Sequence, residues 1–147
     1  MKIIVCPHCD TQNRVPATKP AGSAVCGECH RPLFTGHPVA LDGARFERHL
    51  AQSDIPLLVD FWAAWCGPCR VFAPEFERSA PRLEPRVRLL EINIDEEPQL
   101  AARLAVQSVP TIALFLHGRE LGRFTGAVSE TMLAEWVARH YRVTQAG

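Results

Sequence analysis

The chain has 147 residues, enough for one hydrophobic core of about 100–150 residues and a small appendage. Hydrophobic residues make up 47% of it, and its 16 Lys and Arg residues balance 16 Asp and Glu residues. This balance is not typical of proteins that attract nucleic acid or an anionic membrane through net charge. We therefore expect a globular protein that binds neither.

The N-terminus shows no export signal, because Cys6 follows only a few apolar residues, whereas a secretory signal needs an apolar run of about 7–15 residues. No apolar stretch reaches the roughly 20 residues that span a bilayer. We therefore expect a soluble, cytoplasmic protein. In a reducing compartment, the six cysteines are expected to be metal ligands or redox catalysts rather than structural disulfides.

Residues 1–33 contain no helical or strand period long enough to form a core, so this segment is expected to need a metal ion. Its cysteines form two C-x2-C pairs separated by sixteen residues: Cys6 and Cys9, Cys26 and Cys29. This spacing is typical of a four-cysteine zinc site. Four ligands complete a tetrahedral shell, which predicts one structural Zn²⁺ in a zinc ribbon. His8 and His30 could substitute as ligands, but histidines beside such cysteines are more often surface residues.

Residues 34–40, which include Gly36 and Pro38, are predicted to link the ribbon to a main domain of residues 41–147. The first helix is expected after Asp42, with Phe46 and Leu50 on one face. Hydrophobic patterns then predict, in order, a strand at 55–62, a helix at 67–83, a strand at 87–95, a helix at 96–106, strands at 111–116 and 119–125, and a helix at 129–141. This alternation predicts an α/β fold with a mixed sheet and helices on both faces.

The remaining cysteines, Cys66 and Cys69, lie where a buried strand is expected to end and a helix to begin. Unpaired N–H groups at a helix N-terminus stabilise an anion, so the pKa of the Cys66 thiol should be lowered. The spacing also allows a disulfide, which needs Cα atoms about 4.4–6.8 Å apart. Half of a zinc site, or two incidental buried cysteines, are the alternatives. Because the N-terminal cysteines already supply four zinc ligands, we favour a redox pair.

Asp60 interrupts an apolar strand six residues before Cys66. Charged residues are almost never fully buried without a partner. The residues alone leave two interpretations open: an aspartate satisfied by nearby backbone donors, or a buried acid with a raised pKa and a role in proton transfer.

The segment that runs from Val59 to Cys69, with Cys66-Gly67-Pro68-Cys69 at its end, resembles the active-site segment of thioredoxins. Further matches within about residues 38–142 are Asn93-Ile94-Asp95, Val109-Pro110-Thr111, His117-Gly118 and Gly126-Ala127. With a four-cysteine module before this segment, the chain resembles the zinc-bearing bacterial thioredoxins of the thioredoxin 2 type.

This resemblance implies a thioredoxin fold and a protein-disulfide reductase with a redox-active Cys66–Cys69 disulfide. Cys66 would be the nucleophile, Cys69 the resolving thiol and Asp60 the acceptor of the proton from Cys69. Pro110 would follow a cis peptide bond, although it could be a trans proline that starts a strand. The implied substrate surface consists of Trp65, Gly67, Pro68, Val109, Pro110, Gly126 and Ala127. The implied partners are disulfide-containing proteins and an electron-donating reductase, expected to be thioredoxin reductase.

Two further points stay open at this level. Thioredoxins commonly carry a lysine near the buried aspartate, and the matching position here is Glu91. If Glu91 points toward Asp60 rather than into solvent, it should raise the pKa of Asp60. The alternative function is a zinc-ribbon binding module or a redox switch whose contact with a partner is regulated by the thiol pair.

Overall fold

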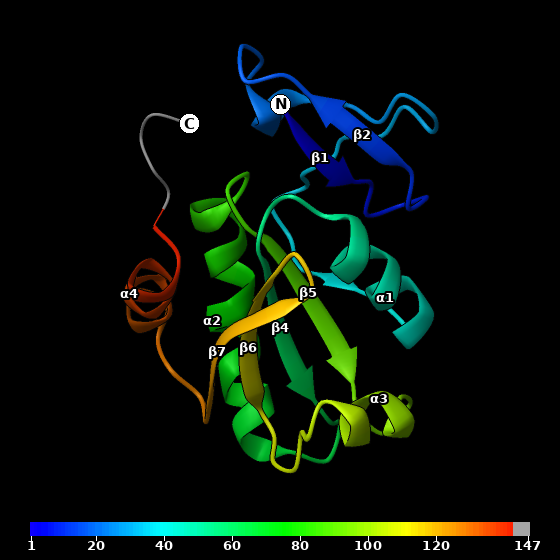
Figure 1. Cartoon of the computed structure of the whole chain (residues 1–147). Helices are drawn as coiled ribbons and strands as arrows, with labels where there is room; N and C mark the ends of the chain where they lie inside the picture. The colour runs from blue at the N-terminus through cyan, green and yellow to red at the C-terminus, as the bar shows by residue number, and fades with distance from the viewer. Residues whose placement is uncertain (143–147) are drawn as a thin grey trace.

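Figure 1 shows the computed structural model of the chain, which describes residues 1–142. A small antiparallel hairpin of β1 (Lys2–Val5) and β2 (Gln12–Val15) lies at one end of a five-stranded sheet with the strand order β3-β5-β4-β6-β7. A 3-10 turn at Ala21–Ser23 follows the hairpin. The five residues 143–147 of the predicted main domain lie outside the described residues.

The main domain has the mixed sheet and the helical layers that the sequence predicts. Its elements are β3 (Val39–Ala40), α1 (Gly43–Gln52), β4 (Leu57–Trp62), α2 (Gly67–Leu83), β5 (Arg88–Asn93), α3 (Pro98–Arg103), β6 (Thr111–Leu116), β7 (Arg119–Thr125) and α4 (Glu130–His140). Strand β4 is central, parallel to β5 and antiparallel to β6. Helices α1 and α3 cover one face of the sheet, and α2 and α4 cover the other (Figure 1).

Each face of the sheet has its own hydrophobic core. On one face, Phe46 of α1 and Leu100 of α3 pack against the apolar side chains of β4 and β5. On the other face, Phe72 and Phe76 of α2 pack with Leu133 of α4. Burial of these layers on both sides explains why the central strands read as almost continuous apolar runs. Among the described residues, no helix combines the length and apolar character that a membrane span requires.

Local interactions define several element ends, and the predicted start of a helix after Asp42 is confirmed. The Asp42 carboxylate accepts a hydrogen bond from the Arg45 backbone N–H at 2.8 Å, and the Ser129 hydroxyl caps α4 in the same way. His117 and Gly118 have φ angles of 51° and 79°, as a tight hairpin turn requires. Helix α3 is shorter than predicted: it begins at Pro98 and ends before Ala105, whose φ is 56°.

The predicted linker was partly wrong. Val39 and Ala40, its last two residues, form β3 and pair with Leu90 and Glu91 of β5. Such a short edge strand has no periodicity of its own and is stabilised only by pairing with β5. At the other end of the segment, Phe34 is buried rather than exposed as a linker residue would be.

The prediction that residues 1–33 have no strand period long enough to form a core was also wrong. The hairpin β1–β2 packs over a small core that consists of Ile4, Cys6, Val15, Cys26, Leu33, Phe34 and Ile55. Ile55 belongs to the segment that leads into β4, so this core is shared with the main domain. The pattern was too short to recognise, because each strand has only four residues.

Polar contacts also join the hairpin to the main domain. The buried Asp10 carboxylate accepts two hydrogen bonds of 2.9 Å from Arg45 of α1 and lies 3.0 Å from Nε2 of the buried His49. From β5, the buried Arg88 donates a hydrogen bond to the Val5 carbonyl, and its guanidinium lies 4.4 Å from the centroid of the Phe34 ring. These contacts fix how the N-terminal unit lies on the sheet.

Candidate active site and metal centre

Cys66 occupies the N-cap of α2, directly after the turn that follows β4. Its backbone is extended, Pro68 lies in the first helical turn, and its sulfur accepts a hydrogen bond of 3.1 Å from the Cys69 backbone N–H. An unpaired N–H at a helix start, aimed at the sulfur, favours the thiolate over the thiol once the pair is reduced.

Cys66 and Cys69 form a disulfide, with their Cα atoms 5.3 Å apart. The separation predicted from the C-x-x-C spacing at a helix start is therefore confirmed. The residues are 3% and 4% exposed, so accessibility does not distinguish their roles. The surroundings of the two cysteines do distinguish them, because the Cys66 sulfur lies 3.5 Å from the Val109 carbonyl oxygen, whereas Cys69 lines a cavity together with Asp60.

The predicted substrate surface gathers around Cys66. Trp65 is 67% exposed, and its indole N–H donates a hydrogen bond of 3.0 Å to Asp95. The Val109–Pro110 peptide bond is cis, as the resemblance implies, and the Pro110 carbonyl accepts a hydrogen bond of 3.0 Å from the Gly126 N–H. Gly126 has a φ of 102°, a backbone conformation that strains any residue with a Cβ. Gly67 and Pro68 are exposed in the first turn of α2, and Ala127 is exposed on the loop after β7.

Asp60 is buried in β4, with 4% of its surface exposed. Within the described residues, its Oδ1 atom has no hydrogen-bond partner, which contradicts the interpretation of a carboxylate satisfied by backbone donors. Burial and, as a smaller contribution, the nearby Glu91 carboxylate together raise the pKa of Asp60 from 3.8 to about 7. This carboxyl group is therefore poised to exchange a proton near neutral pH.

A cavity of about 340 Å³ connects this carboxyl group to Cys69, since Asp60 and Cys69 both line it. Trp62, Arg70 and Ala73 also line it, and the sequence analysis did not identify them. Ala73 could have been recognised, because it lies four residues after Cys69 and therefore on the same face of α2. No local signal marks Trp62, whose place in the wall depends on how β4 lies beside α2.

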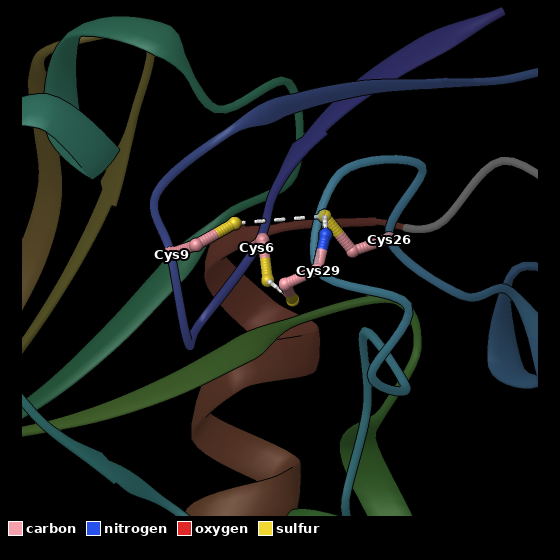
Figure 2. Close-up of side chains that lie close together, drawn as sticks. All are labelled: Cys6, Cys9, Cys26 and Cys29. Carbon is pink, nitrogen blue, oxygen red and sulfur yellow. Dashed lines mark hydrogen bonds between the residues drawn. The ribbon is translucent and has the colours of Figure 1, made fainter.

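The four N-terminal cysteines form a compact cluster between two loops (Figure 2). Their sulfur atoms all lie within 4.8 Å of one another, and the pairs Cys6–Cys29 and Cys9–Cys26 are each 3.6 Å apart. A tetrahedral zinc ion with Zn–S bonds of about 2.3 Å needs sulfur separations of about 3.8 Å. The arrangement therefore fits one tetrahedral metal ion held by four thiolates.

The two loops are built alike, which explains why they present their sulfurs in the same way. In each loop the first cysteine donates its N–H to a residue five positions later, Thr11 or Arg31. The residue four positions after that cysteine, Asp10 or His30, donates back to its carbonyl and has a φ near 65°. Backbone N–H groups of His8 and Glu28 point at the Cys6 and Cys26 sulfurs, at 3.3 and 3.4 Å. Neither histidine belongs to the sulfur cluster.

Comparison with known proteins agrees with both parts of the structure. Residues 37–139 match the Thioredoxin family model, and residues 5–31 match the model described as Thioredoxin 2, N-terminal. Thioredoxin C-3 of Corynebacterium nephridii is 37% identical over 143 residues, which cover 97% of this chain and 98% of that protein. Thioredoxin 1 of Nostoc sp. is 39% identical over 65% of this chain and 89% of its own length.

Solved structures give the same result. A crystal structure of chloroplastic thioredoxin z has a TM-score of 0.65 and 32% identity, and the match covers 76% of this chain and 96% of that one. A mutant thioredoxin of Halobacterium salinarum has a TM-score of 0.66 at 27% identity, with the same coverage. The chain therefore belongs to the thioredoxin family, carries the zinc-ribbon domain of thioredoxin 2, and has in Cys66 and Cys69 the redox-active pair of a thiol–disulfide oxidoreductase.

Proposed function

We propose that this protein reduces disulfide bonds in other proteins, with Cys66 as the attacking thiolate and Cys69 as the resolving thiol. The observation that carries the proposal is the asymmetry of the pair. The Cys66 sulfur faces the helix N-terminus and the Val109 carbonyl, whereas Cys69 lines the cavity that contains the Asp60 carboxyl group. One cysteine is thus suited to attack and the other to give up a proton.

The reaction has two thiol–disulfide exchanges. The Cys66 thiolate attacks one sulfur of the substrate disulfide, forms a mixed disulfide and releases the other substrate sulfur as a thiolate, which takes a proton from water. Cys69 then transfers its proton to Asp60, and its thiolate attacks the Cys66 sulfur. The Cys66–Cys69 bond forms, the bond to the substrate breaks, and the second substrate thiolate leaves.

Each cycle reduces the substrate by two electrons and oxidises the cysteine pair. The pair must be reduced again by an electron-donating reductase, for which we propose thioredoxin reductase. The protein substrates would bind the surface around Cys66. Val109 would offer its backbone groups to an extended substrate peptide, as an added strand pairs with a sheet edge. The remaining surface residues in this role are Trp65, Gly67, Pro68, Pro110, Gly126 and Ala127.

We also propose that residues 1–33 form a zinc ribbon, in which Cys6, Cys9, Cys26 and Cys29 hold one structural Zn²⁺. A four-sulfur shell leaves no open position for a substrate, so the metal stabilises the fold and takes no part in the chemistry. The ribbon lies at the end of the sheet opposite to the carboxyl ends of β4 and β5, and so opposite to the cysteine pair (Figure 1).

Metal analysis of the purified protein is expected to give one zinc per chain, both in wild type and in the Cys66→Ser/Cys69→Ser double variant. Chelation should disorder the ribbon, because metal binding supplies most of its folding energy. The main domain should stay folded, because it has two hydrophobic cores of its own. Its free energy of unfolding should be lower, because Ile55 and Arg88 lose their contacts with the N-terminal unit. Amide NMR spectra before and after chelation test this, and loss of all native signals would show that both parts unfold as one unit.

The proposed activity is tested by turnover. The full-length protein, supplied with an excess of a dithiol reductant, should reduce many equivalents of a disulfide-bonded protein per chain, much faster than the reductant alone. Alkylation of the reduced cysteine pair should remove this acceleration. If substrate disulfides are broken only in proportion to the protein added, or if alkylation has no effect, the proposed reductase activity is wrong.

A further inference from the structure

Asp60 and Glu91 are direct neighbours across two strands. The register of the parallel pair β4–β5 places Asp60 opposite Glu91, at a strand spacing of about 4.8 Å, and paired residues of adjacent strands point to the same face. Both residues line the cavity of about 340 Å³ that also contains Cys69. The two carboxyl groups and the resolving cysteine therefore line one cavity, which is open to solvent beside the exposed residues Arg70 and Ala73.

The two carboxyl groups differ in their access to solvent. Asp60 is 4% exposed, and its Oδ1 atom has no hydrogen-bond partner in the described residues. Glu91 is only half-buried and, together with Trp62, also lines a second cavity of about 270 Å³. It is the one ionisable residue common to the two cavities, so it is the member of the carboxyl pair that exchanges protons with solvent more readily.

We propose that Glu91 is the outer carboxyl group of a pair with Asp60, and that the proton taken from Cys69 leaves the protein through this pair. This inference rests on the reductase function proposed above. After Cys69 has passed its proton to Asp60, the protonated Asp60 gives it to the Glu91 carboxylate, directly or through water, for which the cavity has room. Glu91 then releases it to solvent, and both carboxyl groups return to their starting state.

The charges around Glu91 suit this role. The ionisable residues that face it are Asp60 from β4, Glu77 and Arg70 from α2, Asp42 from the segment before α1, and Glu96 and Glu97 from the loop before α3. From β3, Ala40 lies opposite Glu91 and carries no charge. Burial raises the pKa of Glu91, and the Glu77 carboxylate raises the pKa further. The excess of negative charge thus stabilises the protonated form of either carboxyl group, as a transfer of the proton from Asp60 to Glu91 requires.

The Arg70 guanidinium is the one cation in the cavity wall, and it donates a hydrogen bond of 2.7 Å to the Ala64 carbonyl. It forms no salt bridge with Asp60 or Glu91 within the described part of the chain. The carboxyl pair is therefore not neutralised by a fixed counter-charge, and either member is free to hold the proton.

The test is a single-turnover measurement on the full-length, zinc-loaded protein. Reduced protein is mixed with a fluorescent disulfide-linked peptide, and samples are quenched with acid, so that mixed disulfide and released peptide are counted separately by mass spectrometry. The rate of resolution by Cys69 is measured from about pH 5 to about pH 9. The proteins compared are wild type, Glu91→Gln, Glu91→Asp and the control Glu96→Gln, which removes an exposed carboxylate that lines only the second cavity.

In wild type, resolution should become faster as the pH rises through about 7, because protonated Asp60 cannot accept a proton. Glu91→Gln should move the midpoint to lower pH, since a negative neighbour is lost. It should also lower the plateau rate by roughly 2- to 10-fold, well below the roughly 100-fold or more that general base catalysis contributes. Glu91→Asp and Glu96→Gln should keep the wild-type midpoint.

A Glu91→Gln profile that coincides with wild type would overturn the proposal. A shifted midpoint with an unchanged plateau would mean that Glu91 affects Asp60 only by its charge, and a lowered plateau with an unchanged midpoint would mean a purely structural role. Circular dichroism shows whether each variant is folded. If wild type forms no mixed disulfide at all, the reductase function itself is wrong, and that outcome is seen before any variant is compared.

Discussion

Replacing Cys66 with serine is expected to abolish the reduction of protein disulfides, whereas Cys69→Ser should still attack and should accumulate a mixed disulfide. The reason is the place of each sulfur. Cys66 lies at the N-cap of α2, where the Cys69 N–H supports a thiolate at 3.1 Å, and beside the predicted substrate surface. Cys69 lines the cavity that also contains Asp60, the partner that we propose for its proton transfer.

The measurement uses full-length variants with a disulfide-bonded substrate. Cys66→Ser should reduce it no faster than the chemical reductant alone and should form no covalent adduct. Cys69→Ser should give a substrate-linked species whose mass disappears on treatment with dithiothreitol. Zinc content should be unchanged in both variants, because the four proposed zinc ligands belong to the N-terminal unit, and the hairpin of that unit lies at the end of the sheet opposite to the carboxyl end of β4 (Figure 1). Normal turnover by Cys69→Ser, or an adduct on Cys66→Ser, would reverse the assignment.

The second large effect concerns stability, and Asp60→Ala is expected to become more stabilising relative to wild type as the pH rises from about 4 to about 7. The pKa of Asp60 is raised from 3.8 to about 7 in the folded protein, so the folded state holds this proton more tightly than the unfolded state. The Asp60 carboxyl group therefore lowers the stability of wild type progressively across that pH interval, and its contribution stays constant above about pH 7. At about 1.36 kcal/mol for each pKa unit, the free energy of unfolding of wild type falls relative to that of Asp60→Ala by about 4 kcal/mol over the whole interval.

Denaturant unfolding of the oxidised protein tests this, because the Cys66 and Cys69 thiols do not titrate while they form a disulfide. Asp60→Asn is the matched control, since it removes the charge and nearly keeps the shape. It should follow Asp60→Ala in its pH dependence, offset by the cost of the cavity that alanine leaves. The four N-terminal cysteines contribute equally to the pH dependence of all three proteins, so their contribution cancels in the comparison. A difference from wild type that stays constant with pH would contradict the raised pKa.

The same variants should also slow the release of substrate. Without Asp60, Cys69 has no buried acceptor for its proton, so mixed disulfide should persist longer in Asp60→Ala and Asp60→Asn than in wild type. This kinetic effect is separate from the stability effect: removing the Asp60 carboxylate should make the fold more stable but the reaction slower. A group that destabilises the fold at neutral pH and supports the reaction is typical of an active site.

The sequence by itself determined those features that depend on residues close together in the chain. Asp42 and Ser129 cap α1 and α4, and His117-Gly118 closes the β6–β7 hairpin. Each of these signals acts within one turn, where a side chain and a backbone group can meet without help from the rest of the fold. The same is true of the C-x-x-C pair at the start of α2 and of the two cysteine loops, so the redox pair and the sulfur cluster could be predicted.

Only the tertiary structure decided the features that depend on distant segments. The two-residue strand β3 exists because β5 pairs with it, and the N-terminal unit has a core because Ile55 completes it. Burial of Arg88 follows from the position of the N-terminal unit, not from any pattern around it. Likewise, Asp60 and Glu91 face one cavity only because β4 and β5 pair in one register. A shift of that register by a single residue would turn Glu91 to the opposite face of the sheet, and no residue next to Glu91 in the chain shows which register forms.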